Sequence, residues 1–174
     1  MEHFDTDDVR TYMLDDDGRI PNNPTFPLLV YPGAIPTGDD PVGFCKSRLG
    51  DNGWAGTWVN GVFDYHHYHS NTHEFLGVVA GRAKLALGGP EGVELEVEAG
   101  DAVVLPAGTG HKRLESSSDF RVVGAYPGGQ SYDMNTGAPD ERPEVVDNIR
   151  RVGPPDKDPL FGDAGPLVDI WGSV

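Results

Sequence analysis

The chain has 174 residues, of which 37% are hydrophobic, and a length of this order suits one domain with a packed core, residues 1–174. Its 28 acidic side chains outnumber the 13 basic ones and give a net charge of −15. This excess argues against nucleic acid and membrane surfaces as partners, because binding to either depends on lysines and arginines that neutralise phosphates.

The cysteine content and the apolar segments bear on the compartment. Cys45 is the single cysteine, so no internal disulfide can form and nothing points to an oxidising compartment. The N-terminal residues are acidic and lack the apolar core of a signal peptide, and no apolar run approaches the roughly 20 residues of a membrane helix. We therefore expect a soluble cytoplasmic protein.

Short strands and turns dominate the pattern up to residue 128. The 24 glycines and 15 prolines are too many for a helical protein. Residues 1–45 are expected to form an N-terminal extension with a turn at "DDDG" and a brief strand at "FPLLVY". Residues 46–128 are expected to form the core of an all-β, antiparallel sandwich or barrel. Its expected strands are a long one at 54–69, two joined by a turn at Gly81, and others within 93–98, 102–115 and 119–129.

The remaining residues, 129–174, form a tail rich in proline, glycine and aspartate. One short helix is expected at "RPEVVDNIRRV", with Pro143 in its first turn, where a missing N–H group costs nothing. The segment "PLFGDAGPLVDIW" is expected to be an extended flap that packs on the barrel or on a partner subunit. Exposed sheet edges and this apolar tail favour a homodimer.

Four of the six histidines fall within the twelve residues "DYHHYHSNTHEF". If this segment continues a strand, His67 and His69 face the same side about 7 Å apart, whereas His66 faces the opposite side. Glu74 follows across a short turn, and His111 follows the tight turn "PAGTG". Three imidazoles and one carboxylate suit one divalent ion of Fe, Mn, Ni, Cu, Zn or Co. The alternative is a solvated loop.

The other histidines of the segment have different expected roles. His66 is interpreted as a surface or interface residue because it faces away from the pair. His73 lies in the turn, where it is expected to neighbour the metal ligands or to be exposed; the lesser alternative is that it replaces one of the named ligands.

The spacing of these residues resembles the first motif of the cupins, small antiparallel β-barrels with a metal in the barrel mouth. That motif consists of G, five residues, H-x-H, three or four residues, E, six residues and G. Every spacing is met by Gly61, His67, His69, Glu74 and Gly81.

The second cupin motif consists of G, five residues, P-x-G, two residues, H, three residues and N. Gly100, Pro106, Gly108 and His111 match it, but Glu115 stands where the motif has its asparagine. Two separate motifs with these spacings are far more specific than a lone H-x-H.

Further segments resemble the YjlB-like single-domain bacterial cupins, among them "PNNPTFPLLVY", "PAGTGHK", "VVGAYP" and "DPLFGDAGPL". The resemblance covers most of the chain. It implies an antiparallel double-stranded β-helix, or jelly-roll barrel, with short N- and C-terminal extensions and a metal in its mouth. It implies no particular reaction.

Side-chain alternation suggests further groups around the metal. Phe63 and Tyr65 share the face of the strand histidines, and Arg113 and Glu115 share the face of the histidine that precedes them. We expect Glu74, Glu115 and Tyr65 to be catalytic, and Arg113 and Phe63 to contact a small anionic or oxygen-rich substrate. In the alternative interpretation, Arg113 pairs with Glu115 or with an aspartate at the barrel rim.

Three classes of function are compatible with this set of residues. The first is a metal-dependent, dioxygenase-like oxidoreductase that acts on a small polar molecule, since the ligand set leaves coordination positions open. The second is a metal-dependent isomerase or epimerase of sugars or hydroxy acids, in which a nearby base moves a proton. The third is a cupin that binds a small ligand without turnover. We expect the oxidoreductase.

Overall fold

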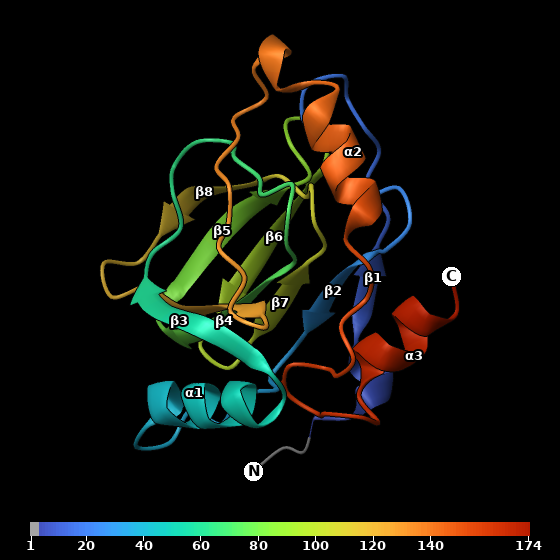
Figure 1. Cartoon of the computed structure of the whole chain (residues 1–174). Coiled ribbons are helices and arrows are strands. Elements are labelled where there is room, and N and C mark those ends of the chain that lie inside the picture. The colour runs from blue at the N-terminus through green and yellow to red at the C-terminus, as the bar shows by residue number, and fades with distance from the viewer. Residues whose placement is uncertain (1–3) are drawn as a thin grey trace.

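The computed structural model describes residues 4–174 and contains two antiparallel sheets that pack against each other (Figure 1). The first has the strand order β1-β2-β7-β4-β9-β3 and the second β6-β5-β8. The strands are β1 (Arg10–Tyr12), β2 (Leu28–Tyr31), β3 (Trp54–Asn60), β4 (Glu74–Ala80), β5 (Arg82–Leu87), β6 (Val93–Glu98), β7 (Ala102–Leu105), β8 (His111–Ser116) and β9 (Arg121–Pro127).

The interior of the barrel is a cluster of apolar side chains between the two sheets. Leu76 and Val78 of β4 pack there with Leu85 of β5. Phe75 and Val79, on the opposite face of β4, belong to a second cluster that includes side chains of α1 (Pro41–Asp51) and α3 (Pro166–Gly172). The larger sheet is therefore buried on both faces, which explains why β4 is a continuous apolar run.

The helices show that the expectation of an all-β chain was incomplete. Helix α1 was not predicted, although it has ordinary start signals. The Asp40 side chain accepts a hydrogen bond from the Gly43 N–H at 2.9 Å, and Pro41 occupies the first turn. Over residues 4–174, no helix combines the length and apolar character needed to cross a membrane.

The tail contains the other two helices. The helix expected near residue 143 is confirmed as α2 (Glu144–Arg151), but Pro143 precedes it instead of lying in its first turn. The prediction of a fully extended flap was wrong, because α3 lies within it. Leu167 and Trp171 of α3 are buried in the outer cluster, so this segment packs on its own chain.

The strands expected after residue 73 are confirmed as β4 to β9. The turn at Gly81 has a φ of +70°, and a Cβ atom there would lie 2.8 Å from the backbone nitrogen of Phe120. Glycine is therefore required at this position by both conformation and space.

The long strand expected at 54–69 was wrong. β3 ends at Asn60, and its side-chain oxygen accepts from the next backbone N–H, that of Gly61, at 2.8 Å. The chain then leaves the sheet, and only single bridges connect His67 to His111 and Tyr68 to Asn135.

Candidate metal centre

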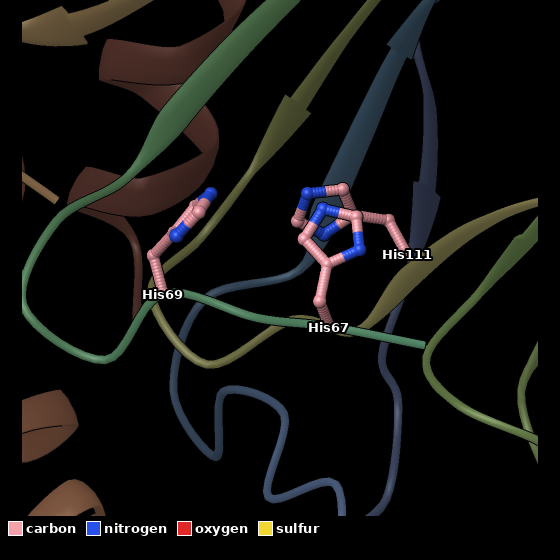
Figure 2. Close-up of side chains that lie close together, drawn as sticks. All are labelled: His67, His69 and His111. Atoms are coloured by element: carbon pink, nitrogen blue, oxygen red, sulfur yellow. The ribbon is translucent and has the colours of Figure 1, made fainter. Parts of the chain in front are cut away.

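Three histidine side chains meet at one end of the barrel. One ring nitrogen from each of His67, His69 and His111 lies within 4.8 Å of the others, and all three residues are buried. Figure 2 shows the rings on the same side of the segment that carries His67 and His69, with His111 arriving from a separate strand.

Backbone hydrogen bonds hold this arrangement without a regular strand. The N–H groups of His67 and His111 donate to each other's carbonyl oxygens at 3.2 and 2.9 Å, and the Gly108 N–H donates to the His69 carbonyl at 2.7 Å. The segment is therefore extended locally, and His67 and His69 keep the common face that the sequence predicted.

Each imidazole is fixed in one tautomer by a backbone carbonyl. The Nδ1 atoms of His67, His69 and His111 contact the carbonyl oxygens of Tyr65, Asp133 and Thr109, respectively. A carbonyl oxygen can only accept, so each Nδ1 donates, and a neutral ring then presents a bare lone pair on Nε2. This is the usual support of metal-bound histidines.

Glu74 adds a carboxylate to these lone pairs. Its oxygens lie 3.2 Å from Nε2 of His111 and 3.4 Å from Nε2 of His69, and Glu74 is 3% exposed. Nε2 of His111 is buried without a hydrogen-bond donor. Acceptors that converge in a buried place need a cation between them, either protons or a metal ion.

The electrostatics of the site agree with a cation-binding role. Burial lowers the pKa of His67 to about 3, so this ring stays neutral. Burial alone would raise the pKa of Glu74, but the imidazoles of His111 and His69 hold it below the usual glutamate range. Glu74 is therefore an ionised carboxylate beside a neutral imidazole, as a metal site requires.

A cavity of about 770 Å³ opens above the site. Its wall includes Tyr126 of β9, whose hydroxyl accepts from Nε1 of Trp58 at 2.9 Å and lies near the carboxylate of Glu74. Because an indole N–H can only donate, the Tyr126 proton is free to point at Glu74. Burial and the charge of Glu74 raise the pKa of Tyr126, which therefore stays a phenol.

The cavity contains two of the four additional residues predicted from the sequence. Phe63 and Arg113 line it, and the guanidinium Nε donates to the Val62 carbonyl at 3.1 Å. Tyr65 is 43% exposed and lies outside the lining, with its ring stacked on Phe63.

Glu115 requires a correction, because it does not share the face of Arg113. Leu85 pairs with Arg113, whereas the preceding Lys84 pairs with Glu115. Leu114 is thus an extra residue in β8, and such a bulge reverses the alternation of side chains beyond it. Glu115 lines a different, outer groove with Lys84, so its position does not support a catalytic role at this site.

The two remaining histidines of the segment differ from each other. His66 is half-buried and outside the cavity lining. His73 is 1% exposed, accepts from the Ala107 N–H at 2.9 Å and contacts the Gly153 carbonyl at 2.9 Å. His73 is therefore a structural link between the barrel and the tail, and both of its ring nitrogens are engaged.

Further cavity residues come from β9 and the tail, and the sequence did not predict them. Tyr126, Tyr132 and Met134 line the cavity, and Asp133 binds Ser70 through its carboxylate. The alternation of large and polar residues in "SYDMN" was the available indication of an extended segment with one face toward the site.

Comparison with known proteins extends these observations. The cupin domain family matches residues 57–123. The chain resembles two solved structures. The DMSP lyase DddQ from Ruegeria pomeroyi DSS-3 has a TM-score of 0.39 and 20% identity over 48% of this chain and 42% of that one. The WlaRB TDP-quinovose 3,4-ketoisomerase from Campylobacter jejuni has a TM-score of 0.41 and 14% identity over 53% and 74%.

A bacterial relative aligns with almost the whole chain. The uncharacterized protein YjlB of Bacillus subtilis (strain 168) is 48% identical over 164 residues, which are 94% of this chain and 97% of that protein. The chain therefore belongs to the cupins, in the family of YjlB.

Proposed function

We propose that this cupin holds one divalent transition metal through Nε2 of His67, His69 and His111 together with the carboxylate of Glu74. The observation that carries the proposal is the convergence of three Nε2 lone pairs and a buried carboxylate, with every Nδ1 committed to a backbone carbonyl. A proton on one histidine satisfies only part of this set of acceptors, whereas a metal ion satisfies all of them together.

We further propose that the site is enzymatic and acts on a small anionic molecule. Arg113 supports this choice: within residues 4–174 no carboxylate lies within salt-bridge distance of its guanidinium, although it lines the cavity of a strongly acidic protein. With Nε held by the Val62 carbonyl, the two terminal amino groups are available for a carboxylate or phosphate.

Oxidation of the dioxygenase type is the first candidate reaction. Three histidines and one glutamate leave coordination positions of an octahedral ion open, and the cavity gives a small molecule access to them. The metal supplies the redox or Lewis-acid chemistry when bound. The chain itself orients the substrate through Arg113 and holds a proton on Tyr126, next to Glu74.

A proton-transfer reaction, such as isomerisation, is the second candidate, and the observation in its favour is the hydroxyl of Tyr126. This phenol is buried, is fixed by Trp58 and lies on the cavity wall. A positioned acid of this kind serves isomerases that need no oxidant.

Elemental analysis of purified protein tests the metal site. We expect about one redox-active metal per chain in the wild type and its loss in His67→Ala and His111→Ala. His66→Ala is the matched control, because that histidine lies outside the cavity lining and should keep the metal. Oxygen consumption with added small carboxylates then separates the two reactions. Wild-type protein that stays metal-free after incubation with each candidate ion would refute the proposal.

A further inference from the structure

We propose that the cavity binds a molecule with two unlike ends: an anionic group that reaches Arg113 and the metal centre, and an aromatic or similarly flat apolar group that stays at the mouth between Phe63 and Tyr132. This inference rests on the proposed function, because it takes the three-histidine site as the floor of the cavity.

Exposed hydrophobic side chains are concentrated at this mouth. Within residues 4–174, three of the large hydrophobic side chains that are at least 43% exposed line the cavity, and a fourth stacks on one of them. Single exposed hydrophobics are ordinary, but a group of them around an opening indicates a binding site. The four are Phe63, Tyr65, Tyr132 and Met134.

One part of the cavity wall joins Arg113 to the segment that carries Phe63. The backbone N–H of Arg113 donates to the Phe63 carbonyl at 2.9 Å, and its side-chain Nε donates to the Val62 carbonyl at 3.1 Å. The Phe63 ring also meets the His67 ring edge-to-face, with 5.3 Å between centroids. The spacing between apolar ring, guanidinium and metal site is therefore fixed before any ligand arrives.

A second part of the cavity wall is formed by the tail, and hydrogen bonds anchor it to the histidine segment. The Asp133 carboxylate accepts from the Ser70 N–H at 2.6 Å, and Asn135 exchanges backbone hydrogen bonds with Tyr68. Tyr132 and Met134 alternate with these anchored residues and line the cavity. The Tyr132 ring lies 4.7 Å from the His69 ring, so each wall carries an aromatic side chain against a metal-site histidine.

The size and the polarity of the cavity match such a ligand. A volume of about 770 Å³ greatly exceeds what an acid of two or three carbons fills, and it lies within the usual range of small-molecule pockets. The floor carries the metal site, Arg113 lies nearby, and the mouth carries apolar rings. A purely polar molecule would leave the rings in water, and a purely apolar one would leave the guanidinium unpaired.

Ligand titration of the cobalt(II)-loaded protein tests this inference. The probes are phenylacetate, acetate, which keeps the charge without the ring, and 2-phenylethanol, which keeps the ring without the charge. Binding is followed by calorimetry and by the visible absorption of cobalt. We expect phenylacetate to bind at least about tenfold more tightly than either other probe.

Four variants assign the preference to residues. Phe63→Ala and Tyr132→Ala should each weaken phenylacetate binding roughly fivefold and leave acetate binding unchanged. Arg113→Gln should weaken binding of both carboxylates. Met13→Ala, an equally exposed side chain outside the cavity, should change nothing.

The outcomes separate this inference from the metal site. Equal binding of phenylacetate and acetate by cobalt-loaded protein would overturn the two-ended ligand and leave the metal centre intact. Tight phenylacetate binding without any bound cobalt would support the two-ended ligand and count against the metal. If Tyr132→Ala turned a dimer into a monomer in sedimentation and left the phenylacetate preference unchanged, the mouth would be an interface between copies and the inference would fail.

Discussion

Removal of one buried hydroxyl tests whether the cavity wall supports the metal centre. Tyr126→Phe keeps the ring but deletes the oxygen that accepts from Trp58 and whose proton is free to point at the nearby Glu74. Glu74 is a buried carboxylate, and the loss of a donor to such a group costs about 1–3 kcal/mol. The half-buried indole of Trp58 adds no more than about 1 kcal/mol, because water can replace its partner. We expect the variant to be about 1–4 kcal/mol less stable.

The same deletion should weaken metal binding. Groups that orient a metal-bound carboxylate typically account for about 10–100-fold of the affinity. Competition titration with a chromophoric chelator measures this change directly, and urea unfolding of the metal-free protein measures stability. The two measurements distinguish a role at Glu74 from a general loss of packing.

Tyr132→Phe is the matched control for this experiment. Tyr132 stacks on Tyr126 at 5.0 Å between centroids, but within residues 4–174 its hydroxyl has no hydrogen-bond partner. The two variants should therefore differ by at least about tenfold in metal affinity. Equal affinities would refute the connection between Tyr126 and Glu74.

One change of pH and two further substitutions have defined effects on metal affinity or on fold stability. Burial lowers the pKa of His69, but the neighbouring Glu74 more than offsets this effect and raises the pKa above 6.5. Protons therefore compete with the metal for His69, and the metal affinity should fall about tenfold per pH unit below that pKa. A metal affinity that stays constant down to about pH 5.5 would contradict this expectation. The Asp158 carboxylate is fully buried and accepts hydrogen bonds from Tyr31, Leu160, Phe161 and Leu167. Asp158→Asn should therefore lower the melting temperature by about 5–15 °C. Asp156 is exposed, and Asp156→Asn should leave the melting temperature unchanged. A Cβ atom on Gly124 would lie 2.2 Å from the Trp58 ring, so Gly124→Ala should reproduce the loss of metal affinity expected for Tyr126→Phe. Gly50 has open space around it, so Gly50→Ala should retain full metal affinity in the same titration.

Much of the barrel and the ligand set follows from local sequence features. The strands β4 to β9 have apolar runs or alternation, and most of them are bounded by glycine-containing turns. The candidate metal ligands follow from the spacing of the histidines and the glutamate in the sequence alone. His67 and His69 remain on one face even outside a strand, because their hydrogen bonds with His111 and Gly108 keep the backbone extended.

The failures of prediction arise where pairing partners decide the conformation. The bulge at Leu114 has no local signal, since it depends on how β8 aligns with β5, and it removes Glu115 from the cavity. The loop after Asn60 likewise depends on hydrogen bonds from Arg113, more than fifty residues away in the sequence. The alternation of side chains along a strand predicts which face of the sheet each one occupies only where the pairing with the neighbouring strand is regular.

The division of the site between barrel and tail has a consequence for its chemistry. All four proposed ligands lie within residues 57–123, the part that matches the cupin domain. Three other residues of the site lie beyond this part. Tyr126 lies near Glu74, Tyr132 forms part of the cavity mouth, and the Asp133 carbonyl orients His69. The shared motif can therefore specify a metal site in this chain without specifying what the metal acts on. We expect substrate selection to depend on the segment that follows β9 together with Phe63 and Arg113, and changes at Tyr132 to alter which molecules bind while the metal remains.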